Sequence, residues 1–290
     1  MKYQEIGQDF VDRVIPARRP DSHKDDYGRV LALCGSRGYT GAAYFAAQAA
    51  VRTGSGVVTL CTPEEVYPIL AGKLNEPVVY PVACNEDGRL TAQGAVQALA
   101  HCRKLDAVLI GCGLGLSDGV REAVQEVLRQ VHCPVIVDAD GINALSGHID
   151  VLRNTAASVI LTPHAGEFRR LIGSSTAREN DAAAFSRETG AIVLLKGHRS
   201  VVCTPDGKRF RNTTGNPGMA KGGSGDVLSG ILLSLCGQGL RAADAACAGM
   251  YLHGAAGDHC ANTLGEYGMT PSDVLHALPM VLRRYNTREW

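Results

Sequence analysis

The sequence lacks several features that would place it in other classes of protein. Its 29 basic residues equal its 29 acidic residues, so no overall charge attracts nucleic acid or an anionic membrane. No stretch approaches about 18 uncharged apolar residues, the length that a membrane-spanning helix needs. Residues 1–19 contain three acidic side chains and no apolar run, so they do not read as a secretory leader. These absences predict a cytoplasmic protein with no nucleic-acid or membrane partner.

The ten cysteines lack any organised spacing. No two of them form a CxxC motif, which argues against a zinc ribbon or a thioredoxin-like pair. Several, such as Cys34 and Cys236, fall within apolar runs and are expected to be small core residues. So many unorganised thiols favour a reducing compartment, in agreement with a cytoplasmic location.

The sequence does contain a repeated alternation of short apolar runs and longer, alanine-rich amphipathic stretches. Strands are expected at residues 29–33, 56–60, 106–110, 134–137, 158–161 and 191–195, with a hairpin formed by 200–204 and 208–212. Helices are expected at residues 41–53, 118–130, 165–171, 177–189, 226–236, 241–260 and 271–284. This alternation predicts an α/β protein with a mostly parallel sheet covered on both faces. We expect a single domain over residues 1–290, since no linker or composition break divides the chain.

The most informative segment runs from Asn212 to Asp226 and reads NTTGNPGMAKGGSGD. It is too rich in glycine to be a strand or a helix, and an apolar helical pattern follows it at once. Glycines let backbone N–H groups face an anion, and the start of a helix adds the positive end of its dipole. We interpret Asp226 as the last loop residue, placed to accept a proton. The segment therefore favours a phosphoryl-transfer site over a purely structural loop.

Five further corners, each rich in glycine or polar residues, follow predicted strands. They are residues 35–43, 111–115, 138–145, 162–167 and 196–200. The first is no Walker A loop, because no Gly-Lys-Ser/Thr follows, and the second lacks the third glycine of the dinucleotide fingerprint. Each of these two could equally be a tight turn. Because ligands of open α/β sheets bind at the carboxyl ends of strands, the five corners together describe one long pocket along a sheet edge.

Two of the polar corners have a binding and a structural interpretation. Asp138 and Asp140, with Asn143, could hold Mg²⁺ through water, since Mg²⁺ prefers oxygen ligands. Asp140 could instead cap a helix. Lys196 beside Gly197 suits a nucleotide phosphate, or else marks a solvated entry to the hairpin.

The corner at residues 162–167 is open to the same two interpretations. His164 and Glu167 lie on one face of the first turn of the predicted helix. Thr162 could cap that turn, with Pro163 at its start. His164 either contacts a ligand or has a purely structural role.

Several of these segments resemble a known family. Gly223-Ser224-Gly225-Asp226 is similar to the GxGD anion-hole motif of ribokinase-like enzymes. The longer run from residue 216 to 226, with residues 137–145, 161–168 and 195–197, is similar to the ADP/ATP-dependent NAD(P)H-hydrate dehydratases. The resemblance covers the chain from about residue 29 onward. It implies a ribokinase-like, three-layer α/β/α sandwich with a mostly parallel central sheet.

The resemblance also implies a reaction, the repair of the hydrated cofactors NADHX and NADPHX. Their ring hydroxyl is phosphorylated from ADP or ATP in the presence of Mg²⁺, and loss of phosphate restores NADH or NADPH. Many relatives carry an N-terminal epimerase domain. Residues 1–28 are expected to be only a short extension, so that an epimerase would be a separate partner. Relatives form tetramers, and the alanine-rich helix from residue 241 is a candidate interface.

By correspondence with the family, site residues fall into four groups. Asp226 would be the catalytic base, with Gly223 and Gly225 in the anion cradle. The hydrated dinucleotide would contact Ala42, Gly113, His164 and Asp226. The adenine nucleotide would contact Lys196, Gly197, His198, Arg199, Ser200 and Gly225. Mg²⁺ would lie near Asp138, Asn143 and Glu167, held through water.

Two other functions stay open at this point. A ribokinase-like kinase for a vitamin precursor or a sugar would use the same loop and the same Asp226, but would leave a stable phosphorylated product. A nucleotide sensor without catalysis would have no use for a base at Asp226. The preference for ADP or ATP, and for NADHX or NADPHX, is likewise open.

Overall fold

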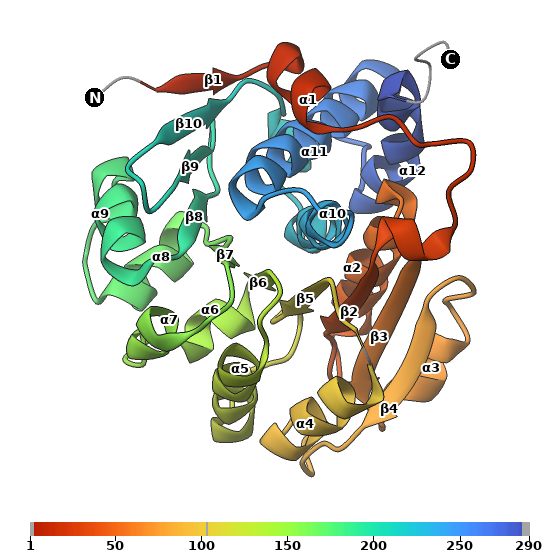
Figure 1. Cartoon of the computed structure of the whole chain (residues 1–290), viewed down its shortest axis with the longest axis vertical. Coiled ribbons are helices and arrows are strands. Elements are labelled where there is room, and N and C mark those ends of the chain that lie inside the picture. The colour runs from red at the N-terminus through yellow and green to blue at the C-terminus, as the bar shows by residue number, and fades with distance from the viewer. Residues whose placement is uncertain (1–2, 103, 286–290) are drawn as a thin grey trace.

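The computed structural model describes residues 3–102 and 104–285, which build around one sheet (Figure 1). The strands are β1 (Gln4–Ile6), β2 (Arg29–Leu33), β3 (Val57–Pro63), β4 (Val78–Val82), β5 (Ala107–Ile110), β6 (Val135–Val137), β7 (Val159–Leu161), β8 (Ile192–Leu195), β9 (Val201–Cys203) and β10 (Arg209–Asn212). Their order is β1-β10-β9-β8-β7-β6-β5-β2-β3-β4. Among the described strands only β9 runs against the others. The predicted mostly parallel sheet is confirmed.

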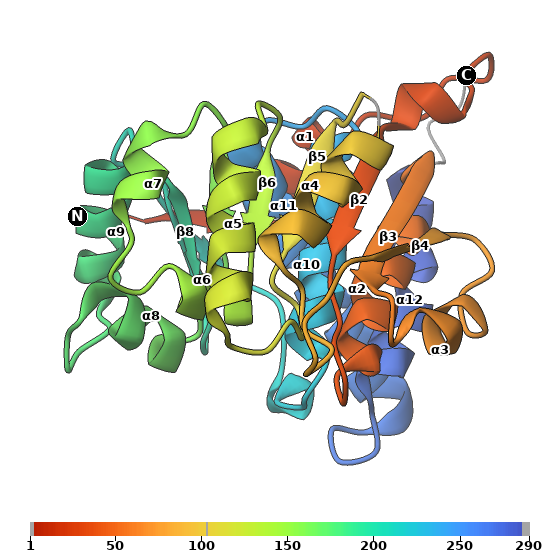
Figure 2. The same ribbon diagram turned by 90° about the horizontal axis from the view of Figure 1, so that it is seen from below.

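Helices cover both faces of this sheet (Figures 1 and 2). Those packed on one face are α1 (Gln8–Val14), α2 (Thr40–Thr53), α3 (Tyr67–Ala71), α10 (Ser224–Gly237), α11 (Ala242–Leu264) and α12 (Pro271–Leu282). Those on the other face are α4 (Ala92–His101), α5 (Asp118–Gln130), α6 (Asp140–Ala144), α7 (Asp150–Asn154), α8 (Ala165–Ile172) and α9 (Glu179–Thr189). Short 3₁₀ turns are η1 (Lys24–Tyr27), η2 (Pro217–Met219) and η3 (Arg283–Tyr285). The predicted three-layer sandwich is therefore confirmed.

The central strands read as continuous apolar runs because both of their faces are buried. In β5, Ala107 and Leu109 join the core under α10, whereas Val108 and Ile110 join the core under α5. Successive side chains of a strand point to opposite faces, so each core takes every second residue. Cys34 and Cys236 are buried in the first of these cores, as predicted.

Helix α10 is the element that carries Asp226 to the sheet edge. It is buried from Val227 to Gly237, between the sheet and helices α2, α11 and α12. A helix that is apolar on all sides is stable only when it is surrounded in this way. At Gly230 a Cβ atom would lie 2.2 Å from the carbonyl oxygen of Ala46, so glycine is required where α10 crosses α2. This close packing fixes the position of the first turn of α10.

The strand order also locates a crevice. The chain runs outward through β2, β3 and β4, and then returns to place β5 on the other side of β2. In open α/β sheets the connections on either side of such a switch point leave opposite faces, and ligands bind outside the carboxyl ends of the strands there. The corners after β2 and β5 are thus the natural walls of a binding crevice.

The structure differs from the sequence-based predictions in its first residues, between β3 and β5, and between β6 and β7, where α7 was not predicted. The segment expected as a bare extension holds β1, which pairs in parallel with β10, and α1, which packs on α11. Strand β4 and helices α3 and α4 were not predicted either. Most alanines of α11 are buried inside this chain against neighbouring elements, which removes them from an interface between copies.

No helix in the described parts of the chain is long and apolar enough to cross a membrane.

Candidate active site at the carboxyl ends of the strands

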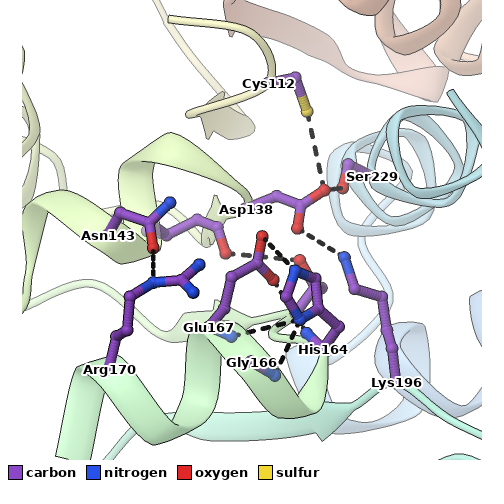
Figure 3. A network of polar contacts seen from close by, with 11 residues as sticks. Cys112, Asp138, Asn143, His164, Gly166, Glu167, Arg170, Lys196 and Ser229 are labelled. Atoms are coloured by element: carbon purple, nitrogen blue, oxygen red, sulfur yellow. Dashed lines mark hydrogen bonds and ion pairs between the residues drawn. The ribbon is translucent and has the colours of Figure 1, made fainter. Parts of the chain in front are cut away.

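An ion pair between the buried Asp138 and the mostly buried Lys196 lies at the centre of the site (Figure 3). Asp138 directly follows β6 and is 1% exposed, and its Oδ1 lies 2.9 Å from Nζ of Lys196, which directly follows β8. The hydroxyl of Ser229, on α10, donates to Asp138 Oδ2 at 2.7 Å. The thiol of Cys112 lies 3.8 Å from the same oxygen. Four segments far apart in the sequence therefore meet at one carboxylate.

The ionised form of this pair is favoured in spite of its burial. Burial acts to raise the pKa of Asp138, but the charge of Lys196 and hydrogen bonds from Thr162, Lys196 and Ser229 hold that pKa below its usual value. Burial likewise acts to lower the pKa of Lys196, and the charges of Asp138 and Glu167 raise it overall. A buried charge pair that is also hydrogen-bonded in this way supplies fixed charges to a ligand.

Asp226 faces this pair from the first turn of α10. Helix α10 begins at Ser224, two residues earlier than predicted, so the expectation that Asp226 ends the loop is wrong. Burial, together with the negative charge of Asp138, raises the pKa of Asp226 to about 6, and hydrogen bonding to Cys112 and the charge of Lys196 oppose this rise. A carboxylate with a pKa in this range suits a general base near neutral pH.

The glycines of the loop make room for close approach to the ion pair. A Cβ atom at Gly225 would lie 3.3 Å from Lys196 Nζ and 3.7 Å from Asp138 Oδ2. Gly223 has a φ of +100°, a conformation that glycine adopts readily, and a Cβ there would lie 2.9 Å from the ring of Phe45. The turn is thus held between Phe45 and the ion pair, with its backbone N–H groups at the start of a helix.

Two predicted substrate contacts come together at the switch point. Gly113, after β5, has a φ of +64°, and a Cβ there would lie 2.8 Å from the Cβ of Ala42 in α2. The hydroxyl of Ser36, after β2, donates to the carbonyl of Gly113 at 2.8 Å. The β2 and β5 corners therefore pack directly against each other, with Gly113 lying beside both Ala42 and Tyr39.

His164 has a structural contact that the sequence did not predict. It occupies the N-cap position of α8, where its Nδ1 accepts from the N–H groups of Gly166 at 2.9 Å and Glu167 at 3.2 Å. The Glu167 carboxylate accepts from the backbone N–H of His164 at 2.9 Å (Figure 3). This capping box replaces the cap expected at Thr162, which is buried two residues earlier, after β7. The His164 side chain is still 54% exposed, and so stays available to a ligand.

The three residues predicted near Mg²⁺ have protein partners. Asp138 pairs with Lys196, Glu167 caps α8, and Asn143 Oδ1 accepts from Nε of Arg170 at 3.0 Å. Asp140 is no helix cap, because Ala139 holds the N-cap position of α6. The Asp140 carboxylate instead accepts from the N–H of Gly115 at 2.8 Å.

A different set of side chains has the spacing of a cation site. One atom each of Cys112, Asp138 and Asp226 lies within 4.8 Å of the others. Its two carboxylates have the oxygen chemistry that Mg²⁺ prefers, whereas the thiol does not. The predicted metal assignment to Asp138, Asn143 and Glu167 stays a prediction, and Asp226 joins Asp138 as a candidate carboxylate.

The turn predicted to hold the nucleotide is the exposed connection between β8 and β9. Its ends are joined by the Ser200 hydroxyl, which donates to the carbonyl of Gly197 at 2.9 Å and accepts from its N–H at 3.1 Å. Arg199 has a φ of +54° and pairs with Glu5 of β1 at 3.1 Å, and His198 is exposed. The turn adjoins Lys196 in the chain but takes no part in the buried pair, and its role stays a prediction.

Three residues of the site went unpredicted. Ser229 lies three positions after Asp226 on α10, and this helical spacing could have found it. Cys112 stands in a corner that was singled out only for its glycines. His253 on α11 is 7% exposed, and its Nε2 lies 3.3 Å from the hydroxyl of Ser224. Burial, with the nearby charge of Lys196, lowers the pKa of His253 to about 4.

The fold and the loop place the molecule in the ribokinase-like class of α/β proteins. Ribokinase from Thermotoga maritima matches with a TM-score of 0.56 over 88% of this chain and 99% of that one, at 14% identity, which shows a shared fold. A family model described as NAD(P)H-hydrate dehydratase matches residues 30–280. The chain belongs to this family, as the sequence motifs predicted.

Individual relatives agree with that assignment. The bifunctional NAD(P)H-hydrate repair enzyme of Moorella thermoacetica is 43% identical over 93% of this chain and 52% of its own length. The ADP-dependent (S)-NAD(P)H-hydrate dehydratase of Neisseria meningitidis is 38% identical over 84% of this chain and 81% of its own. The ADP/ATP-dependent dehydratase of Bacillus subtilis, co-crystallised with ATP and Mg²⁺, matches with a TM-score of 0.84 and 32% identity over 98% and 99% of the two chains. This chain spans about half the length of the bifunctional relatives.

Proposed function

We propose that this protein dehydrates (S)-NADHX and (S)-NADPHX to NADH and NADPH at the expense of ADP or ATP, as a hydro-lyase that repairs these cofactors. The observation that carries the proposal is the position of Asp226. It is a partly buried carboxylate in the first turn of a helix that follows a glycine-rich loop, and it faces a buried Lys–Asp pair. That arrangement combines a base with an anion cradle, which are the two parts that phosphoryl transfer to a hydroxyl requires.

In the proposed reaction Asp226 takes the proton of the ring hydroxyl as the hydroxyl oxygen attacks the terminal phosphorus of the nucleotide. The bond from that phosphorus to the bridging oxygen breaks, and the shortened nucleotide leaves. The backbone N–H groups of Gly223 and Gly225 stabilise the transferred phosphoryl group, whose charge grows in the transition state. The bond from the ring carbon to the phosphate oxygen then breaks, the neighbouring ring carbon loses a proton to the departing phosphate or to solvent, and the ring double bond is restored.

The remaining residues position the two substrates. Gly113 and Ala42, which lie together at the switch point, would contact the hydrated ring, and the exposed ring of His164 belongs to the corner after β7. Lys196 and the turn at residues 197–200 would hold the nucleotide phosphates. Mg²⁺, when bound beside Asp138, with Asn143 and Glu167 as its predicted neighbours, would neutralise phosphate charge, and Asp226 would remain the base.

Three wider properties belong to the same proposal. The dehydratase acts in the cytoplasm, where the reduced cofactors that it repairs are used. It works as a homotetramer, by its resemblance to the family. An epimerase would supply the (S) epimer. The bifunctional names of several relatives support this pairing, because they join repair activities in one chain.

The test is recovery of the near-ultraviolet absorbance of reduced nicotinamide from NADH hydrate, with Mg²⁺ and either ADP or ATP. We expect nucleotide-dependent recovery by the wild type and none by Asp226→Asn. Replacement of Asp206, in the exposed β9–β10 turn, by Asn is a matched control that should keep the activity. A stable phosphorylated product in place of recovered NADH would instead indicate a kinase for another alcohol.

A further inference from the structure

The loop that joins β10 to α10, residues 213–223, lies against one helix along much of its length. At its start, the hydroxyl of Thr214 donates to the carbonyl of Tyr251 on α11 at 2.9 Å. At its end, Ser224 is within 3.3 Å of Nε2 of the buried His253, also on α11. The glycine-rich loop that forms the anion cradle is therefore attached to α11 on both sides.

Asp258 of α11 holds the loop between these two points. Its Oδ2 accepts from the N–H of Gly215 at 2.9 Å, and its Oδ1 accepts from the side-chain amide of Asn216 at 2.9 Å. The other atom of that amide, Asn216 Oδ1, accepts from the N–H of Gly218 at 3.0 Å. One carboxylate thus fixes two loop residues directly and the η2 turn through a third hydrogen bond. Because both of its partners donate, the position needs an acceptor at each oxygen.

Two glycines of α11 bring the loop into contact with the helix backbone. A Cβ atom at Gly254 would lie 2.3 Å from Oγ1 of Thr214, and one at Gly257 would lie 2.2 Å from the sulfur of Met219. Each glycine within a helix costs about 1 kcal/mol relative to alanine. Close contact with the loop explains why glycine, and not alanine, occupies these two positions. Residues 253, 254, 257 and 258 share one face of the helix by their spacing.

We propose that this face of α11, made by His253, Gly254, Gly257 and Asp258, is a platform that fixes the phosphate-binding conformation of the loop before the nucleotide arrives. Its members are positioning residues, since they act through the loop. The inference rests on the proposed function, because it assigns the loop to phosphate binding. Preorganised donors accelerate a reaction because they need not reorganise as charge develops.

An exchange of two side chains tests the platform. Asp258→Asn turns an amide N–H₂ toward that of Asn216, and Asn216→Asp opposes two carboxylates, so each single variant breaks the contact. The double variant Asp258→Asn with Asn216→Asp restores it. The new amide at position 258 then accepts from Gly215 and donates to the new carboxylate at position 216, whose second oxygen still accepts from Gly218. Asp244→Asn, near the start of α11 and away from the loop, is the matched control.

We expect each single variant to lower kcat by about 10- to 100-fold, which is the scale of misplacement by about 1 Å. Amide hydrogen exchange should speed up at residues 215–225 while the rest of α10 and α11 keeps its protection. The double variant should recover both properties, and Asp244→Asn should change neither. Unchanged loop exchange in the single variants, or a double variant as impaired as they are, would overturn the platform. If the wild type does not dehydrate NADH hydrate, the proposed function fails, while exchange with and without ADP and Mg²⁺ still decides the role of α11.

Discussion

Polar side chains in the inner part of the site and polar side chains at its rim have different kinds of hydrogen-bond and ion-pair partners. The inner cluster consists of Cys112, Asp138, Lys196, Asp226 and Ser229, whose partners come from the ends of β5, β6 and β8 and from α10. The rim consists of His164, His198, Arg199 and Ser200, which are at least partly exposed, with contacts mostly to residues close in the chain. The inner charges are fixed by the packing of the whole domain. The rim is fixed mainly by its own turns and by the exposed Arg199–Glu5 pair, so that binding can rearrange it at small cost.

The largest effect that this comparison predicts is at Asp226. We expect Asp226→Asn to lower kcat by about 10²- to 10⁴-fold, the range for loss of a general base. The same change should raise the free energy of unfolding at neutral pH by about 1–2 kcal/mol, because it removes a charge that burial and Asp138 disfavour. Dehydration rates and urea unfolding measure the two effects. If Asp226→Asn lost stability as well as activity, the prediction that the two change in opposite directions would be wrong.

Breaking the inner ion pair comes next. Lys196→Met leaves the Asp138 carboxylate buried without its partner, and we expect a loss of about 3–5 kcal/mol in the free energy of unfolding. Adding Asp138→Asn should recover most of that stability without restoring activity. Thermal and chemical unfolding of the two variants measures these changes. If Lys196→Met lowers the free energy of unfolding by no more than the loss of a surface ion pair does, the distinction between inner cluster and rim is wrong.

The pH dependence of the rate is a milder test. Asp226 must be ionised to act as a base, so kcat should rise about tenfold per pH unit up to a pH of about 6 and level off above it. Stability should change in the opposite direction. Between a pH of about 4 and 6 the native state holds a proton that the unfolded chain has released, so the contribution of Asp226 to stability falls as pH rises. The fall should disappear in Asp226→Asn, and its persistence there would assign it to another group.

The smallest effect is expected at the rim. Arg199→Ala removes the exposed ion pair with Glu5, which should change the free energy of unfolding by less than about 1 kcal/mol. The KM for the nucleotide should rise by a few fold, with kcat nearly unchanged, because only ground-state binding is weakened. Steady-state kinetics separates the two constants. A large fall in kcat would move Arg199 into the inner cluster.

The sequence predicted the strands and helices that belong to the regular strand–helix alternation of this fold. Strand β2 and helix α5 begin and end at the predicted residues, since an apolar run or a strong amphipathic pattern marks them. Strand β1 has three residues and is stabilised by β10, about 200 positions away, which no local pattern can indicate. Strand β4 contains Pro81, a residue that argues against a strand unless the strand lies at an edge.

Some residues of the site could likewise be predicted from the sequence, and others could not. Asp138 and Lys196 each directly follow a strand, so their places at one edge could be predicted from the strand ends, and Asp226 lies in the first turn of the helix that follows the glycine-rich loop. The capping box of His164 was missed because threonine is a preferred N-cap residue and histidine is not, so the sequence pointed to Thr162 as the cap. His253 and Asp258 could not be found, because the packing of α11 on the loop, rather than any spacing, brings them to it.

The pairing of β1 with β10 has a consequence for behaviour in concentrated solution. An unpaired strand edge invites a strand from another molecule, and β1 covers the edge that β10 would otherwise present. It is itself only three residues long, with Gln4 and Glu5 exposed. At the opposite end of the sheet, Pro81 removes an N–H donor from β4 (Figure 1). Both margins of the sheet are thus poor templates for further strand addition, and this protects the protein against edge-to-edge aggregation.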